Sequence, residues 1–209
     1  NNSAAMEASR AITRRSASNL APAFLTLDKP RRLAMSALYA FCREVDDVAD
    51  EEMSPLETRR AELEEWRQDV RRACERGSPE KIVIQELQPV IEKYALKFEY
   101  FDELILGIET DVEQDRYETF QDLDQYCYRV ASVVGLLSIE IFGYRNDDCQ
   151  EYAVHLGKAL QLTNILRDVG NDAERGRIYL PQEAMEKFGV DPRSLMAFNY
   201  SSAFHNLAA

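Results

Sequence analysis

Hydrophobic residues recur along this chain at spacings of three and four positions, which is the period of an α-helix. Leu33, Ala37, Phe41, Val45 and Val48 follow that spacing through one continuous stretch. The alternation of apolar and polar residues that marks half-buried strands is nearly absent. The pattern therefore predicts an all-α fold built from roughly eight helices.

Residues that favour helix ends predict where several of these helices begin and stop. Ser54-Pro55-Leu56-Glu57 predicts a start with Ser54 as the N-cap, and Gly77 predicts the end of that helix. Ser78-Pro79 repeats the start signal. One later helix is expected around Phe101 to Ile108, and the next runs from Thr119, its N-cap, without interruption to Gly143. Another is expected over 147–169. A short helix should end at Gly189, and the last helix should start at Asp191-Pro192.

The chain of 209 residues is long enough for one domain with a sizeable core, since 45% of its residues are hydrophobic. No linker or low-complexity segment divides it. We expect residues 1–15 to form an N-terminal arm or, ahead of Met6, an artificial extension. Residues 16–209 are expected to form a single domain.

The net charge of −12, from 25 basic and 37 acidic residues, disfavours nucleic-acid binding because phosphate neutralisation needs a basic face. None of the four cysteines forms a Cys-x-x-Cys pair, so zinc ligation is not expected and a reducing, cytoplasmic setting is favoured. No run of about 18 apolar residues could span a bilayer. Peripheral contact with the inner membrane surface stays open, as does the oligomeric state.

The first candidate for chemistry is a stripe of acidic residues. Asp46 and Asp50 are four residues apart, so they share one face of a predicted helix. Extending that face backward brings in Arg43 and Tyr39. Like charges at this spacing cost a helix about 0.2–0.5 kcal/mol per pair, so helix stability alone does not favour the arrangement.

A second stripe contains Gln161, Asn164, Asp168 and Asp172. Carboxylate and amide oxygens suit Mg²⁺, a hard cation that usually keeps water and phosphate oxygens among its ligands. The arginines around this stripe suit the phosphates themselves. Two facing acidic helices are therefore predicted to hold Mg²⁺ around a diphosphate, and the alternative is a pair of solvated acidic faces.

The spacing of four is weak evidence by itself, because Asp111 and Asp115 have it too. This third pair lies in the polar run 109–118, which is typical of a solvated helix end. We expect it to be background, so that replacing Asp111 by Asn is nearly silent. The other two pairs differ in having an apolar helix before them and aligned polar partners.

Longer motifs are more specific. ALYAFCREVDDVAD (37–50) and LGKALQLTNILRDVGNDAERGRIYLP (156–181) resemble the two aspartate-rich signatures of the squalene/phytoene synthase family. YCYRVASVVGLLSIEIFG (126–143) resembles the segment between them. The resemblance extends over residues 16–198 in the family's order, and the middle segment is most similar to that of bacterial presqualene diphosphate synthases.

The resemblance implies an all-α isoprenoid synthase bundle with a central cavity. It also implies a Mg²⁺-dependent prenyltransferase that joins two allylic prenyl diphosphates head to head. The positions that it assigns are Asp46, Asp50, Asn164, Asp168 and Asp172 for Mg²⁺, Tyr39, Arg43, Gln161, Ser16 and Ser18 for the substrate, and Tyr126 beside the reacting carbons. The apolar wall is expected from Val133, Val134, Leu136 and Leu137, with small Ala131 and Gly135 leaving room for a prenyl chain.

Two departures from the family pattern stand out. Asn19-Leu20 replaces a common Ser/Phe-type pair in the N-terminal flap that carries Ser16 and Ser18. Family members usually continue beyond the equivalent of Ala209 with helices that close the cavity, so we expect a truncated chain.

The favoured activity is the condensation of two farnesyl diphosphates to presqualene diphosphate, a precursor of squalene and hopanoids. A phytoene synthase that uses two geranylgeranyl diphosphates for carotenoids is the alternative within the family. Asp46-Asp47-x-x-Asp50 also fits a head-to-tail prenyltransferase or a terpene cyclase. A non-catalytic scaffold on the same fold is the remaining alternative.

Overall fold

The computed structural model describes residues 6–15, 23–51 and 53–209. Within these ranges the chain forms helices and one isolated bridge between Arg116 and Ile178, with no strand. The predicted all-α fold is confirmed. The elements are α1 (Glu7–Arg15), α3 (Lys29–Asp50), α4 (Leu56–Cys74), α5 (Ile82–Tyr94), α6 (Phe98–Glu113), α7 (Phe120–Cys127), the π-helical segment η1 (Tyr128–Ser132), α8 (Val133–Phe142), α9 (Asp148–Glu174), α10 (Gln182–Phe188), α11 (Pro192–Met196) and α12 (Ser202–Ala208).

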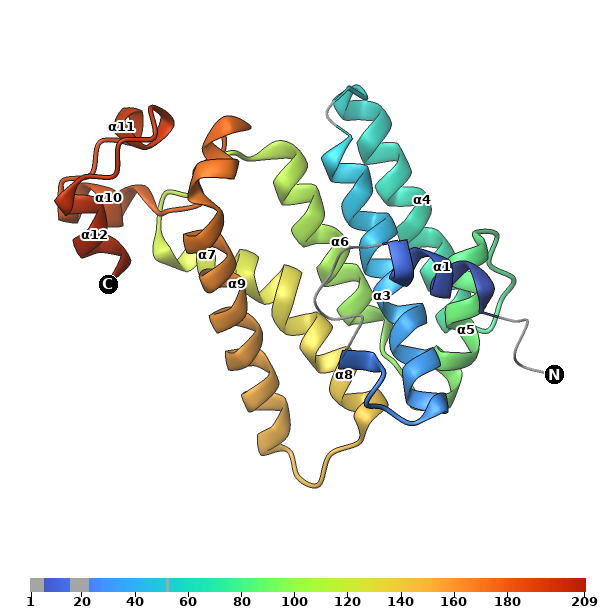
Figure 1. The fold of residues 1–209 in the computed structure, drawn as a ribbon. Coiled ribbons are helices and arrows are strands. Elements are labelled where there is room, and N and C mark those ends of the chain that lie inside the picture. The colour runs from blue at the N-terminus through green and yellow to red at the C-terminus, as the bar shows by residue number, and fades with distance from the viewer. Residues whose placement is uncertain (1–5, 16–22, 52) are drawn as a thin grey trace.

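Helix α3 is the centre of the larger hydrophobic cluster, where it packs against α1, α4, α5, α6 and α8 (Figure 1). Phe41 of α3 is fully buried and makes edge-on ring contacts with Trp66 and Phe101, at centroid distances of 6.1 and 5.3 Å. The long helix α9 lies on the other side of η1 and α8, and α10 to α12 lie beyond it (Figure 1). A second cluster, which includes Ile165, Val169 and Leu195, joins α9 to these last helices.

A buried carboxylate attaches α1 to the body of the protein. Glu86 of α5 accepts hydrogen bonds from the backbone N–H groups of Ala8 and Ser9, at 3.0 and 2.7 Å. These donors have no partner inside α1 because they belong to its first turn. Glu86 therefore caps α1 from a distant helix and fixes where the N-terminal segment crosses α3 and α5.

Several predicted helix ends are confirmed. The Thr119 side chain accepts a hydrogen bond from the backbone of Asp122, which completes a capping box at the start of α7. Gly189 ends α10 in the left-handed conformation with φ of 71°, and Asp191 caps α11. In each case a residue with a specific backbone or side-chain role marks the boundary.

Other boundaries were predicted wrongly. Pro55, and not Ser54, occupies the N-cap position of α4, and none of the described side chains caps that helix. Helix α5 begins at Ile82, three residues after the Ser78-Pro79 signal, because Asp69 of α4 binds the backbone N–H groups of Glu80 and Lys81. Helix α9 extends beyond 169, to Glu174, and α12 follows the helix that was expected to be last.

The helix expected without interruption up to Gly143 contains the π-helical segment η1. Helix α9 packs closely against this segment. A Cβ atom at Gly157 would lie 2.6 Å from Cα of Ser132, so only glycine fits there, and Ser132 Oγ donates to the Val154 carbonyl at 2.7 Å. Among the described residues, no helix combines the length and apolar content that crossing a membrane requires.

Candidate functional site

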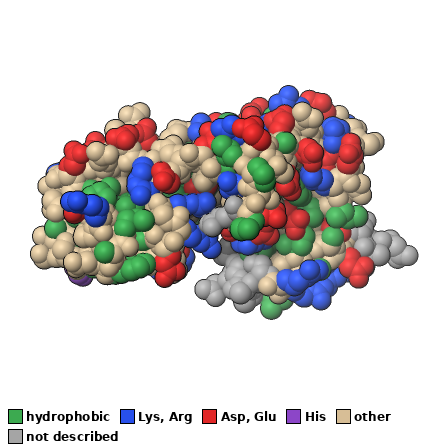
Figure 2. Space-filling view, turned by 90° about the horizontal axis from the view of Figure 1, so that it is seen from above, with side chains coloured by type: hydrophobic (Ala, Val, Ile, Leu, Met, Phe, Trp, Pro, Cys, Tyr) green, Lys and Arg blue, Asp and Glu red, His purple; other side chains and the backbone are tan. Residues whose placement is uncertain are grey.

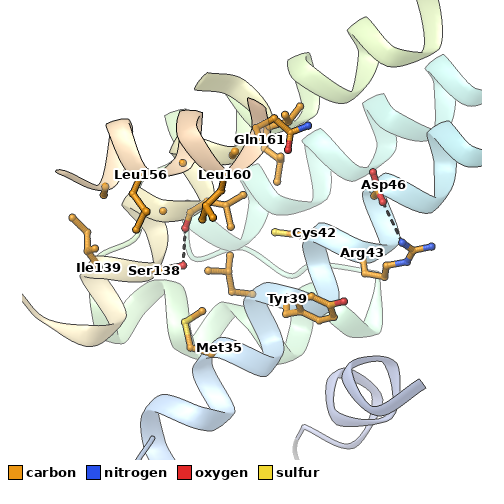
Figure 3. A pocket seen from close by; sticks show the side chains of 18 of the residues that line it. Met35, Tyr39, Cys42, Arg43, Asp46, Ser138, Ile139, Leu156, Leu160 and Gln161 are labelled. Carbon is orange, nitrogen blue, oxygen red and sulfur yellow. Dashed lines mark hydrogen bonds and ion pairs between the residues drawn. The ribbon is translucent and has the colours of Figure 1, made fainter. Parts of the chain in front are cut away.

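A cavity of about 810 Å³ lies between α3 and α9, with α6, η1 and α8 as its floor. Its lining changes character from one end to the other. Figure 3 shows Arg43 and Asp46 of α3 at one end, and Ile139 and Leu156, from α8 and α9, at the other. The predicted central cavity is therefore present, and it joins a charged end to an apolar end.

The charged end collects residues that the two acidic stripes predicted. Tyr39, Arg43 and Asp46 reach it from α3, and Gln161 and Asn164 reach it from α9. Asp50, Asp168 and Asp172 are outside the lining, one and two turns further along the same two helices. Ser16 and Ser18 lie outside the described residues.

The apolar end is built by α8 and α9. Ala131, Val134 and Gly135 line the cavity as expected. The expectation for Val133, Leu136 and Leu137 was wrong, because these side chains are buried away from the cavity. Further lining residues are Met35, Val130, Ser138, Ile139, Phe142, Tyr152, Leu156 and Leu160.

On α9 this apolar wall is also open to solvent. Tyr152, Leu156 and Leu160 line the cavity, yet 67%, 42% and 56% of their surfaces are exposed. Their spacing of four places them on one face of the helix. The described residues therefore leave the cavity uncovered along that face.

The negative charge of the α3 stripe is only partly neutralised. Arg43 Nη1 lies 3.3 Å from Asp46 Oδ2, and its other terminal nitrogen pairs with Asp47. Burial and the neighbouring Asp50 nevertheless raise the pKa of Asp46 to about 6. Arg43 is thus shared between Asp46 and Asp47, and Asp46 is incompletely neutralised.

The α9 stripe divides its charge differently. Arg167 binds Asp168 through two hydrogen bonds, at 2.8 and 2.6 Å, and these bonds lower the pKa of Asp168. Asp172 has no such partner among the described residues, and burial together with Asp168 raises its pKa to about 6. The stripe therefore contains one paired carboxylate and one that resists ionisation.

The two stripes lie at the same end of the cavity. Arg175, which follows α9, reaches Asp50 with a separation of 3.4 Å between Nη1 and Oδ1. Asp111 of α6 is close enough to Asp46 and Asp172 to raise the pKa of both. Figure 2, which views the protein from above, shows a group of blue side chains near the middle of the molecule and red side chains to its right.

Asp111 was predicted wrongly as part of a solvated helix end. It is partly buried, it lines the cavity, and its two oxygens accept hydrogen bonds from the hydroxyl groups of Tyr126 and Tyr179, at 2.7 and 2.9 Å. Burial raises the pKa of Asp111, although the two hydroxyls act against that rise. Asp115 is exposed, as expected.

Sequence reasoning also missed Tyr179. Arg177, one of the arginines expected around the second stripe, lies close to both Asp111 and Tyr179. The sequence did contain a signal for Asp111. It comes seven residues after Leu104 and three after Ile108, two buried residues of the same helix, so helical spacing places it on the buried face.

The charged end offers the ligand chemistry that Mg²⁺ requires. No group of three His, Cys, Asp or Glu side chains in the described ranges is close enough to bind a metal ion by itself. Mg²⁺ commonly binds through one or two carboxylates together with substrate phosphates and water. Asp46 and Asp172 each sit among other carboxylates, and a cation there would relieve that repulsion. The residues present therefore fit Mg²⁺ that is shared with a diphosphate.

Comparisons with known proteins cover most of the chain. The family model described as squalene/phytoene synthase matches residues 13–209. The chain is 47% identical over 175 residues to a presqualene diphosphate synthase of Rhodopseudomonas palustris, which covers 82% of this chain and 62% of the relative. It is 39% identical over 206 residues to a 15-cis-phytoene synthase of Synechococcus elongatus, covering 92% of this chain and 66% of the relative.

Solved structures agree with the fold. A squalene synthase from Alicyclobacillus acidocaldarius superposes with a TM-score of 0.89 at 30% identity, covering 98% of this chain and 76% of that one. A dehydrosqualene synthase in complex with a ligand gives the same TM-score at 32% identity, covering 98% and 71%. The chain thus spans between about three fifths and three quarters of the length of these proteins.

Proposed function

The chain belongs to the squalene/phytoene synthase family, and on that premise we propose that it joins two allylic prenyl diphosphates head to head. Within this reaction class we propose farnesyl diphosphate as the substrate and presqualene diphosphate as the product. The relatives named presqualene diphosphate synthase, at 40–47% identity, support this choice over phytoene synthesis.

The single observation that carries the proposal is the joining of two environments in one cavity. Carboxylates and Arg43 occupy one end, while aliphatic and aromatic side chains line the rest. A prenyl diphosphate has the same division, with a charged head and a long apolar chain. The cavity volume of about 810 Å³ is within the range of ligand-binding pockets, which spans roughly 300–1,000 Å³.

Asp46, Asp50, Asn164, Asp168 and Asp172 are the residues that would hold Mg²⁺. Bound there, Mg²⁺ would neutralise charge on the departing diphosphate. Arg43 adds a fixed positive charge at the same end, and Tyr39 and Gln161 add polar side chains that can orient the head group. These residues act on the leaving group.

The apolar wall acts on the carbon skeleton. When the carbon–oxygen bond of the first substrate breaks, its electron pair leaves with diphosphate and an allylic cation remains. Val134 and Ile139 line the α8 side of the cavity with apolar surface, which would keep water from that cation on this side.

The double bond of the second substrate then supplies the electron pair for the new carbon–carbon bond. A proton is lost, and the electron pair of its carbon–hydrogen bond closes the cyclopropane ring. The released diphosphate would receive this proton, and Tyr126 lines the cavity at the same charged end.

Product analysis tests the proposal. The full-length protein is incubated with Mg²⁺ and either farnesyl or geranylgeranyl diphosphate, and products are identified by mass spectrometry. We expect a C30 cyclopropylcarbinyl diphosphate from farnesyl diphosphate. Preference for the C20 substrate, with phytoene as product, would replace the substrate but keep the reaction class.

Two further outcomes would overturn the reaction class. Product formation only when isopentenyl diphosphate is added would indicate head-to-tail condensation. No diphosphate release from any prenyl substrate, by a protein that is folded and contains Mg²⁺, would favour the scaffold alternative.

A further inference from the structure

Three tyrosine rings surround Asp111 at the charged end of the cavity. Tyr126 packs against Tyr117 and Tyr179 with centroid distances of 5.4 Å to each, and Tyr117 and Tyr179 are 5.8 Å apart. The rings come from α7, from the loop after α6, and from the loop after α9. Only Asp111 and Tyr126 of this cluster reach the cavity lining.

Backbone pairing between two loops fixes the cluster. The N–H of Ile178 donates to the Asp115 carbonyl at 3.0 Å, and the N–H of Gln182 donates to the Tyr117 carbonyl at 2.8 Å. Arg116 Nη1 also donates to the Gly176 carbonyl at 2.7 Å. Tyr117 and Tyr179 are therefore held by their own main chain, and Asp111 is not needed to bring their rings together.

The hydrogen bonds of Asp111 determine how two hydroxyl groups are oriented. An ionised carboxylate can only accept, and each of its two oxygens here receives one tyrosine hydroxyl. Both phenolic hydrogens consequently aim at Asp111. The lone pairs of Tyr126 Oη then remain for the cavity, so Tyr126 presents the negative end of its hydroxyl dipole to whatever lies beside it.

We propose that Asp111 is a positioning residue for the condensation: by fixing the hydroxyl hydrogen of Tyr126, it turns the oxygen of that tyrosine toward the cationic intermediate. No bond to Asp111 forms or breaks. A dipole already oriented toward developing positive charge stabilises it without reorganisation during the reaction. This inference rests on the proposed function and assigns a role to a carboxylate outside the two acidic stripes.

The test compares Asp111→Asn in the wild-type and Tyr126→Phe backgrounds. The amide that replaces the carboxylate would donate to one phenolic oxygen, so one hydroxyl hydrogen turns away from it. We expect kcat to fall by about 10- to 100-fold with KM nearly unchanged. With Tyr126→Phe there is no hydroxyl to orient, so adding Asp111→Asn should change kcat by less than about 3-fold.

Two variants separate positioning from packing. Asp115→Asn is the matched control, since Asp115 is the exposed member of the same pair, and its kcat should equal that of the wild type. Asp111→Glu keeps a group that only accepts hydrogen bonds. The kcat of Asp111→Glu should be higher than that of Asp111→Asn, even if both variants lower the thermal midpoint equally.

A spectroscopic measurement tests the orientation without turnover. The Raman doublet of tyrosine distinguishes hydroxyls that donate a hydrogen bond from those that accept one. Asp111→Asn should reduce the donor signal of the wild type, and the difference should vanish when Tyr126 and Tyr179 are both Phe.

Equal kcat in the wild type and Asp111→Asn would overturn the proposal. So would an equal fold-loss in both backgrounds, which would indicate a structural role, or the absence of the Raman difference. If the wild type forms no condensation product, the proposed function fails, and the Raman comparison alone decides whether Asp111 orients the hydroxyls.

Discussion

The acidic stripes of α3 and α9 share one spacing, yet their carboxylates are in different electrostatic states. On α3, Arg43 is shared between Asp46 and Asp47, and the pKa of Asp46 is raised to about 6. On α9, Arg167 is committed to Asp168, whose pKa is lowered. The comparison teaches that spacing places carboxylates on a helix face, while their neighbours decide how readily each one ionises.

The largest effect is expected when one negative charge is removed from either stripe. Asp46→Asn and Asp168→Asn keep the side-chain shape, and each should lower kcat by roughly 10²–10³ if the carboxylate stabilises the departing diphosphate. Turnover at saturating Mg²⁺ and substrate measures this. Asp115→Asn is the control, and full activity in both stripe variants would refute their assignment.

The pH dependence of stability should separate the two stripes more sharply. The pKa of Asp46 rises from 3.8 in the unfolded chain to about 6 in the fold. Protonation therefore favours the folded state, and the stabilisation that it brings is lost as pH rises through 6. In the metal-free protein, the wild type should lose this stabilisation and Asp46→Asn should not. The thermal midpoint of Asp46→Asn should therefore exceed that of the wild type by more at pH 7 than at pH 5.

Asp168 should behave in the opposite sense. Because its folded pKa lies below 3.8, its ionised form contributes stability above that pH, and this contribution is lost only in more acidic solution. The loss caused by Asp168→Asn should thus be the same at pH 5 and pH 7. If the difference in thermal midpoint between Asp168→Asn and wild type changed with pH as it does for Asp46→Asn, the opposite pKa shifts assigned to the two stripes would be contradicted.

At pH 7 the two substitutions should also differ in sign. Asp46→Asn relieves like-charge repulsion of about 0.2–0.5 kcal/mol and should raise the metal-free midpoint by about 1–2 °C. Asp168→Asn breaks the pair with Arg167 and should leave the midpoint level or lower it, since such pairs contribute about 0–1 kcal/mol. Differential scanning calorimetry without Mg²⁺ measures both.

The smallest expected effect concerns the contact between the stripes. Arg175 and Asp50 are both exposed, and their separation is 3.4 Å. A pair of this kind is worth little, so Arg175→Gln should shift the midpoint by less than about 1 °C. A larger loss would show that this contact, and not the packing of η1 and α8 between the helices, holds the stripes together.

The sequence predicted features that depend on local chemistry. Helical period determined the fold class, and the capping roles of Thr119 and Asp191 belong to single residues and their nearest neighbours. It failed where distant residues intervene. Asp69 delays the start of α5 by binding the backbone before it, and no residue near Ser78 indicates that contact.

In the candidate site, too, local sequence motifs were predicted and contacts between distant residues were missed. The family resemblance that the long motifs predicted is confirmed by the match over residues 13–209. Asp111 was missed because its partners, Tyr126 and Tyr179, are 15 and 68 residues away in the chain. Its polar sequence neighbours indicated solvent, while its position on the buried face of α6 indicated the interior, and the tertiary contacts decided the outcome.

The π-helical segment η1 makes the number of residues in this part of the chain as important as their identity. A π-turn closes over one residue more than an α-turn, so η1 takes up an extra residue without turning α8 relative to α7. Deleting one residue from 128–132 would convert this turn into an α-turn and leave Val134 facing the cavity and Leu137 facing the core. Deleting one residue from 134–136 would instead turn the rest of α8 by about 100°, so that Ser138 takes the present direction of Leu137 and carries a hydroxyl into the core. The stretch between Tyr126 and Gly143 can therefore lose a residue within η1 and not within α8.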